Sequence, residues 1–173
     1  MKIFEYCPRC KSSDISFDNI KKFKCSACSF IYFHNVATAA AAILEYDNKI
    51  ILIKRSREPG KGKLDLPGGF IDPEESVEDG LNREIKEELG ITLDKIKYLG
   101  SAPNVYIYKD VTYNTCDLFF YSKIESIPTE FNKTEISELV LINPEEIVPR
   151  DFAFKSTPKG LELFRNTKDR ERY

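Results

Sequence analysis

Residues 76–90 constrain the fold of this chain more than any other segment, because their pattern specifies a helix with one buried face. Ser76 followed by Asp79 is a capping-box start, and Gly90 is a glycine stop. Between them, apolar residues recur at helical spacing and form the stripe Val77, Leu81, Ile85 and Leu89. The segment is therefore predicted to be an amphipathic helix that packs this stripe in a larger domain.

Three glutamates share a second face of the same helix. Glu84, Glu87 and Glu88 stand at i, i+3 and i+4, and like charges at this spacing destabilise a helix by a few tenths of a kcal/mol per pair. A cation among them would remove this repulsion, and hard oxygen ligands select Mg²⁺ or Mn²⁺. Such a cluster beside a Gly-rich loop suits a diphosphate, whereas a solvated helix face is the simpler alternative.

The residues around the glutamates resemble the Nudix box, whose pattern is G-x5-E-x7-R-E-U-x-E-E-x-G-U, where U is a bulky aliphatic residue. All fixed positions are met, by Gly69, Glu75, Arg83, Glu84, Ile85, Glu87, Glu88, Gly90 and Ile91. This resemblance implies an α+β fold, namely an α/β/α sandwich around a mixed, mainly antiparallel sheet.

The resemblance also implies roles for individual residues. Glu84, Glu87 and Glu88 would be metal ligands and catalytic residues, and a backbone carbonyl near Gly68 would join the metal shell. Arg83 would orient the glutamates, and Glu75 would close the loop before the helix. The implied reaction is hydrolysis assisted by Mg²⁺ (or Mn²⁺), in which metal ions neutralise the diphosphate and activate a water.

A further catalytic base is expected after the sheet. Glu135 lies in TEISELVLINPEEI, which resembles the segment where many Nudix proteins carry such a glutamate. Glu138 is the competing candidate, and a surface charge without a catalytic role is an equally weighted alternative for Glu135.

Four of the five cysteines form a metal-binding pattern. Two CxxC pairs, Cys7 with Cys10 and Cys25 with Cys28, are separated by 14 residues. This spacing is close to that of zinc ribbons, and a closed Cys₄ site predicts structural Zn²⁺. A redox pair or a chance arrangement is the alternative. The set leaves His34 without a ligand role, and Cys116 is expected to be a buried free thiol.

A zinc ribbon directly before a Nudix box is similar to the NADH pyrophosphatase group. Members of that group carry SQPWPFPxS after the box, where this chain has SAPNVYIYK. Ser101 and Pro103 match the motif, while its Trp, Phe and later prolines are replaced.

Aromatic residues after the box are candidates for the substrate pocket. Tyr106, Tyr108 and Tyr113 could stack on a base or a nicotinamide ring, with packing within the sheet as the alternative. Ser101 is included as a substrate-binding candidate through its match to the motif. Phe152 and Phe154 resemble pocket residues of related proteins, although packing is an alternative role. The expected substrate is a small nucleoside diphosphate derivative such as ADP-ribose or NADH.

The chain is expected to divide into a zinc ribbon over 1–34 and a Nudix domain over 35–173. The first segment has few large apolar residues and needs a metal to hold it together. In the second, strands are expected over 36–44 and 49–54, with a turn at 46–48, and then a loop over 55–69. A hairpin of 104–108 and 111–124, a strand over 139–142, and helices at 144–148 and near the C-terminus complete the expectation.

Charge and hydropathy limit the partners. The net charge is −2, and the +3 balance of residues 1–35 would be nearly cancelled by a zinc-bound Cys₄ site, so nucleic acid is not the expected partner. No apolar run approaches a membrane span, and no signal peptide is recognised, so a cytoplasmic location is expected. A homodimer is expected by analogy.

Two other functions remain open from the sequence. The first is a ligand-sensing or binding module on a Nudix frame without catalysis, although such proteins usually lose glutamates of the box. The second is an enzyme that acts on capped RNA, with the ribbon guiding the strand.

Overall fold

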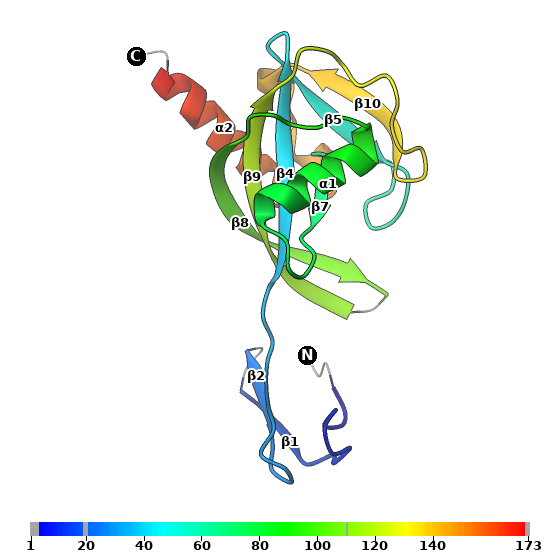
Figure 1. Ribbon diagram of the computed structural model, residues 1–173, viewed down its shortest axis with the longest axis vertical. Coiled ribbons are helices and arrows are strands. Elements are labelled where there is room, and N and C mark those ends of the chain that lie inside the picture. Colours follow the sequence, from blue (N-terminus) through cyan, green and yellow to red (C-terminus); the bar gives the residue numbers. More distant parts are fainter. Residues whose placement is uncertain (1–3, 19–20, 110, 172–173) are drawn as a thin grey trace. The chain divides into compact units, whose positions relative to one another are not determined.

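Two compact units divide the chain, Met1–Val36 and Ala37–Tyr173 (Figure 1). The computed structural model describes residues 4–18, 21–109 and 111–171 of them. No helix in this described part of the chain is long and apolar enough to cross a membrane.

The first unit contains a three-stranded antiparallel sheet in the order β1-β2-β3. Its strands are β1 (Ile15–Asp18), β2 (Lys22–Cys25) and β3 (Ile31–Phe33). Phe23 is 1% exposed, and four rings lie 5.4–6.0 Å from its ring centroid: Phe4, Phe17, Phe30 and Tyr32. Phe17, Phe23 and Tyr32 stand opposite one another in the register of the three strands, so alternation of side chains places them on one face. The unit thus has a small aromatic core that the sequence did not predict.

The second unit is built on a mixed sheet in the order β10-β5-β4-β9-β8. These strands are β4 (Ala37–Tyr46), β5 (Lys49–Arg55), β8 (Lys97–Tyr108), β9 (Val111–Lys123) and β10 (Ile136–Ile142). Short strands β6 (Leu64–Asp65) and β7 (Gly68–Phe70) pair with β5 and β4. Only the pairing of β4 with β9 is parallel among the described strands, so the predicted mixed, mainly antiparallel sheet is confirmed.

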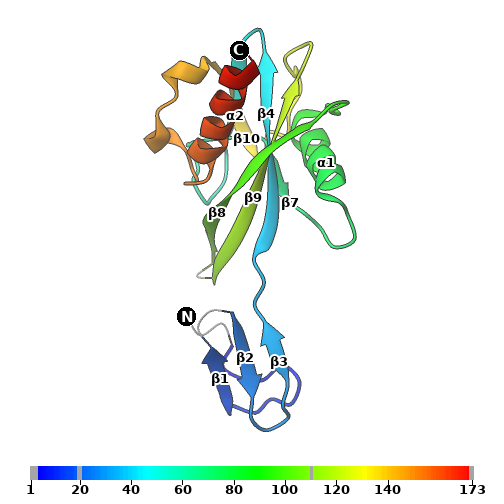
Figure 2. The same ribbon diagram turned by 90° about the vertical axis from the view of Figure 1, so that its left-hand side faces the viewer.

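Two helices, α1 (Val77–Leu89) and α2 (Thr157–Glu171), cover opposite faces of this sheet (Figure 2). On the first face Leu81, Ile85 and Leu89 of α1 pack in a core with Ile53 and Phe120, among others. On the second face Leu161 and Phe164 of α2 pack with Ile43, Phe119 and their neighbours. The α+β sandwich predicted from the sequence is therefore confirmed.

Local signals in the sequence placed the turns and the caps of α1 correctly. Asp47 and Asn48 have positive φ angles of 48° and 61° and join β4 to β5. The Ser76 side chain accepts a hydrogen bond from the Asp79 backbone N–H at 3.1 Å, and Gly90 has a φ of 68°. In the predicted hairpin turn, Asp110 lies outside the described residues.

Some element boundaries differ from those expected. The expected loop over 55–69 contains β6 and the start of β7, which are too short for a periodic pattern and exist through pairing with β5 and β4. β8 begins at Lys97 rather than at 104, and it tolerates Pro103 because it is an edge strand. β10 begins at Ile136, and the expected helix at 144–148 is a 3₁₀ turn over Pro144–Glu146, followed by a second over Pro149–Asp151.

Candidate active site

Two glycines of β7 allow the acidic face of α1 to approach the sheet. The Gly68 backbone N–H donates to Glu88 Oε2 at 2.8 Å. A side chain at Gly69 would collide with the Glu84 carboxylate, and one at Gly68 would collide with the Ala40 carbonyl. The Gly-Gly pair therefore lets two of the predicted ligand carboxylates lie directly against the backbone of β7.

Arg83 holds the loop before α1 and one of the glutamates. Its guanidinium donates to Glu75 Oε1 at 2.7 Å, to Glu84 Oε1 at 2.8 Å and to the Phe70 carbonyl at 3.0 Å. Glu75 also accepts from the Asp72 backbone N–H at 2.7 Å, so it closes the loop. Only a 3.7 Å ion pair joins Arg83 to Glu87, whose side chain is 61% exposed.

Burial and charge raise the pKa of two of the glutamates. Loss of solvent raises the pKa of Glu88 to about 8, against the opposing hydrogen bond from Gly68. The nearby charges of Asp65, Glu84 and Glu135 also contribute to this raised value. The pKa of Glu84 is also raised, first by burial and then by the charges of Glu87 and Glu135, while Arg83 opposes the shift. A bound cation would relieve these energetic costs.

The possible ligand atoms at this site suit a hard divalent cation. They are carboxylate oxygens of α1 and backbone carbonyl oxygens of the neighbouring strand β7. Among the described residues, however, only the four cysteines bring three or more possible ligand atoms within 4.8 Å of one another. The hydrogen bonds from Arg83 and Gly68 hold Glu84 and Glu88 to separate partners. The assignment of Glu84, Glu87, Glu88 and Gly68 as ligands stays a prediction.

The two candidates for a further base lie in different surroundings. Glu135 forms a 2.6 Å ion pair with Arg57, and its charge contributes to the raised pKa of both Glu84 and Glu88. Glu138 instead pairs with Lys54 at 3.3 Å, and both of those side chains are exposed. The structure thus brings Glu135 to the acidic cluster, together with Arg57, which sequence reasoning missed.

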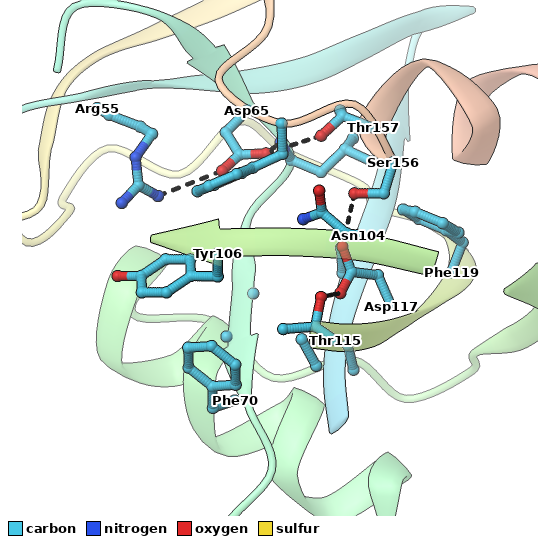
Figure 3. Close-up of a pocket in the computed structure, with 17 residues that line it drawn as sticks. Arg55, Asp65, Phe70, Asn104, Tyr106, Thr115, Asp117, Phe119, Ser156 and Thr157 are labelled. Carbon is cyan, nitrogen blue, oxygen red and sulfur yellow. Dashed lines mark hydrogen bonds and ion pairs between the residues drawn. The ribbon is translucent and has the colours of Figure 1, made fainter. Parts of the chain in front are cut away.

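A small, partly open pocket lies beside β7. Residues of β4, β7, β8, β9 and the segment 154–157 line it (Figure 3). Gly68 and Gly69 belong to its wall, so the pocket and the acidic face of α1 share the same glycines.

Two buried carboxylates form polar networks in this pocket (Figure 3). Asp65 pairs with Arg55 at 3.2 Å and accepts from Thr157 Oγ1 at 3.1 Å. Burial raises the pKa of Asp65 to about 6, although Arg55 opposes the shift. Asp117 accepts from Thr115 Oγ1 at 2.6 Å and from Ser156 Oγ at 2.5 Å. Sequence reasoning missed both, since no local pattern distinguishes these aspartates.

The aromatic candidates lie in two adjoining places. Tyr106 lines the pocket, with its ring centroid 5.7 Å from Phe154 and 5.3 Å from Phe70. Tyr108 and Tyr113 line a neighbouring apolar hollow that Tyr106, Phe70 and Ala37 share. Phe152 is buried in the core on the α2 side rather than in the pocket.

Ser101 does not line this pocket. Alternation along β8 directs Ala102, Asn104 and Tyr106 to the face that carries the pocket and Ser101 to the other face. Its proposed contact with substrate has no support from this geometry, whereas Asn104 lines the pocket and was not a candidate.

The four predicted zinc ligands converge in the first unit. Cys7 Sγ lies 3.7 Å from Cys28 Sγ, and Cys10 Sγ lies 3.6 Å from Cys25 Sγ. Sulfurs around a tetrahedral zinc are about 3.8 Å apart when the Zn–S bonds are roughly 2.3 Å, so the cluster is compatible with structural zinc. Cys116 is a free cysteine, as expected, but it is half-buried rather than fully buried.

Comparison with known proteins agrees with this geometry. The NUDIX domain model matches residues 34–164. An ADP-ribose pyrophosphatase of Methanocaldococcus jannaschii is 46% identical over 81 residues, which are 47% of this chain and 43% of that protein. The NAD-capped RNA hydrolase NudC of Vibrio atlanticus is 30% identical over 98 residues, which are 57% of this chain and 36% of that protein. This chain therefore spans about two fifths of the length of these curated relatives.

A solved structure shows the same fold. The crystal structure of a NUDIX hydrolase from Nitrosomonas europaea superposes with a TM-score of 0.67 and 25% identity, and the match covers 91% of this chain and 88% of that one. The domain match, the intact box and the sandwich on which it lies agree with one another. The chain belongs to the NUDIX family.

Proposed function

We propose that this protein hydrolyses the diphosphate linkage of a nucleoside diphosphate derivative, giving a nucleoside monophosphate and a phosphorylated second product. One observation carries the proposal. The acidic face of α1 lies against Gly68 and Gly69, and the same two glycines line a pocket that also has aromatic and polar walls. Glu84 and Glu88 do not line the pocket themselves, so the diphosphate would extend from the pocket past these glycines to reach the two carboxylates.

The relatives narrow the class of substrate. One is named an ADP-ribose pyrophosphatase and another a NAD-capped RNA hydrolase, and ADP-ribose and NAD each contain a diphosphate that joins adenosine to a second ribose-containing group. ADP-ribose, NADH or a similar small molecule is therefore the substrate class that we propose for this chain.

Each residue of the site has a proposed task. Glu84, Glu87 and Glu88, with the backbone carbonyl of Gly68, would hold Mg²⁺ or Mn²⁺. Such an ion, when bound, neutralises phosphate charge and lowers the pKa of a bound water. Arg83 holds Glu84 and Glu75 in place through its hydrogen bonds.

Glu135 is the proposed general base. It lies close enough to Glu84 and Glu88 to raise their pKa values, and it can accept a proton from a water at the cluster. Arg57 holds the carboxylate through its 2.6 Å ion pair.

The other proposed parts of the protein lie outside this site. Tyr106 and Tyr108 are proposed to stack on rings of the substrate. Cys7, Cys10, Cys25 and Cys28 are proposed to bind a structural Zn²⁺ within a ribbon over 1–34, ahead of a catalytic domain over 35–173.

The test is the release of AMP with Mg²⁺ from a panel of NADH, NAD, ADP-ribose, FAD, diadenosine polyphosphates and sugar nucleotides. We expect cleavage of at least one diphosphate and a loss of about 100-fold or more in kcat for Glu88→Gln. Glu135→Gln should lose about 100-fold, as expected for removal of a general base. Glu138→Gln, its matched control on the same segment, should stay within about twofold.

Either of two results would contradict the proposal. If wild type cleaves no diphosphate in the panel, the function is wrong, and the non-catalytic binding module becomes the better reading. If Glu88→Gln retains full activity on a cleaved substrate, the acidic face of α1 is not the catalytic centre.

A further inference from the structure

Asp117 is a buried acid at the inner end of the pocket. It is 8% exposed, and its two hydroxyl donors, Thr115 and Ser156, are 3% and 2% exposed. Each donor occupies one position on a different carboxylate oxygen. A carboxylate has about four acceptor positions and no donor, so Asp117 keeps acceptor positions for a group in the pocket.

Asn104 lies on the same face of the sheet as Asp117. Asn104 pairs with Thr115 in the register of β8 and β9, and Asp117 stands two residues further along β9. Ala102, which has a small side chain, is the residue opposite Asp117 in this register. Among the described residues, the Asn104 side chain has no hydrogen-bond partner, and Figure 3 shows its amide between the Asp65 and Asp117 networks.

The walls of the pocket fit a flat ring. Three aromatic rings line the pocket: Tyr106, Phe154 and Phe70. The Arg55 guanidinium lies over the Phe154 ring, 5.0 Å from its centroid. A base that stacks on one of these rings lies in the pocket that Asn104 and Asp117 also line, so its polar edge can reach these two side chains. Stacking alone tolerates every base, so any selection must come from the polar groups there.

The Asp117 carboxylate and the Asn104 carboxamide together favour one kind of nucleobase edge. An acceptor-only carboxylate favours an exocyclic amino group and disfavours a carbonyl oxygen. A carboxamide can donate to and accept from the adjacent amino and ring-nitrogen positions of adenine. We propose that Asn104 and Asp117 read the amino-bearing edge of an adenine ring in this pocket and so set the base preference of the enzyme. The inference rests on the proposed function, because it concerns the base of the nucleotide that is cleaved.

The test compares ADP-ribose with its hypoxanthine counterpart, IDP-ribose, which differs in carrying a carbonyl and a ring N–H at that edge. For wild type we expect kcat/KM to favour ADP-ribose by about 10-fold or more. Asp117→Asn supplies a donor to the carbonyl, so the preference should fall by about 10-fold or more and can reverse. Asn104→Leu should also reduce the preference, and as a half-buried surface position it keeps the test valid if Asp117→Asn fails to fold.

Ser156→Ala is the matched control. It removes one hydrogen bond to Asp117 but leaves the carboxylate, so it should change both substrates by the same factor and keep the wild-type ratio. A purely structural role of Asp117, as an anchor for the start of α2, would give Asp117→Asn this same result.

The outcomes separate the two proposals. Cleavage of neither substrate nor any other diphosphate refutes the proposed function. Cleavage of both at rates within about threefold refutes base reading while the function stands. A wild-type ratio that survives both Asp117→Asn and Asn104→Leu refutes the role of these residues.

Discussion

At the scale of single residues, Glu88 is a buried carboxyl group beside other acidic groups, and a bound metal ion would offset the cost of this arrangement. Its carboxyl is 6% exposed, accepts one hydrogen bond from Gly68 and faces the negative charges of Asp65, Glu84 and Glu135. The pKa of about 8 follows from these surroundings. An ordinary core position would exclude such a group, so its presence favours a role in binding a cation.

This pKa predicts how the stability of the metal-free protein depends on pH. The folded-state pKa of about 8 lies above the unfolded value of 4.5, so the folded state binds the extra proton between these values. The free energy of unfolding should therefore be highest near pH 5 and fall by a few kcal/mol, on the order of 2–4, as pH rises to 8. Asp65, with a pKa of about 6, adds to the fall at the lower end.

Urea denaturation in EDTA-treated buffer between pH 5 and 8.5 measures this dependence. Glu88→Gln should flatten the curve and be more stable than wild type at pH 8, because it keeps an acceptor for Gly68 without the charge. Glu87→Gln, at an exposed position of the same helix, acts only through the pKa of Glu84 and should leave most of the fall between pH 5 and 8 in place. A wild-type curve that rises between pH 6 and 8 would contradict this account of Glu88.

At the scale of elements, α1 is fitted to the loop before it as much as to the sheet. Gly80 lies in the middle of the helix, where glycine costs about 1 kcal/mol relative to alanine. A Cβ there would lie 2.6 Å from Glu75 Oε1 and 2.8 Å from Ile71 Cδ1. Glu75 cannot move aside without breaking its hydrogen bonds to Arg83 and Asp72. The glycine therefore lets the loop close on the helix.

Gly80→Ala should consequently destabilise the protein, by about 1–3 kcal/mol, although helix propensity alone predicts a gain. Displacement of Glu75 and Arg83 should also lower kcat with Mg²⁺. Lys86→Ala, at an exposed position of the same helix, is the control and should stay within about 0.5 kcal/mol of wild type. Chemical denaturation of both variants gives the comparison, and a stabilised Gly80→Ala would show that the loop yields freely.

At the scale of the whole molecule, the two units are stabilised by different means. The unit Ala37–Tyr173 has a sheet with an apolar core on each face. The unit Met1–Val36 has one fully buried ring, Phe23, and four convergent thiols. So small a core contributes little to the free energy of folding, and bonds between the thiolates and a metal ion can supply the rest of that free energy.

Removal of metal should therefore act on the first unit. We expect one Zn²⁺ per chain, and a thiol reagent should titrate Cys116 alone in the native protein. After treatment with a strong chelator it should titrate all five cysteines. Metal analysis and thiol titration on the same sample measure both values, and five reactive thiols in the zinc-loaded protein would contradict a closed Cys₄ site.

Features that depend on neighbouring residues could be predicted from the sequence. Ser76, Gly90 and the stripe through Leu81 and Ile85 specify α1 because capping and amphipathicity act within a few turns. The CxxC pairs and the spacing of the box glutamates are equally local, so the sequence predicts the four-cysteine cluster and the family.

Which polar groups contact one another in the pocket depends on the tertiary structure. Ser156 is 39 residues from Asp117, and Thr157 is 92 residues from Asp65, so no local pattern could indicate either pair. The same holds for β7, which is a strand only because it pairs with β4. It also holds for Glu135, whose charge acts on Glu88 although the two residues lie far apart in the sequence. Local forces shape elements along the chain, whereas a binding pocket depends on contacts that form only when distant strands and helices pack together.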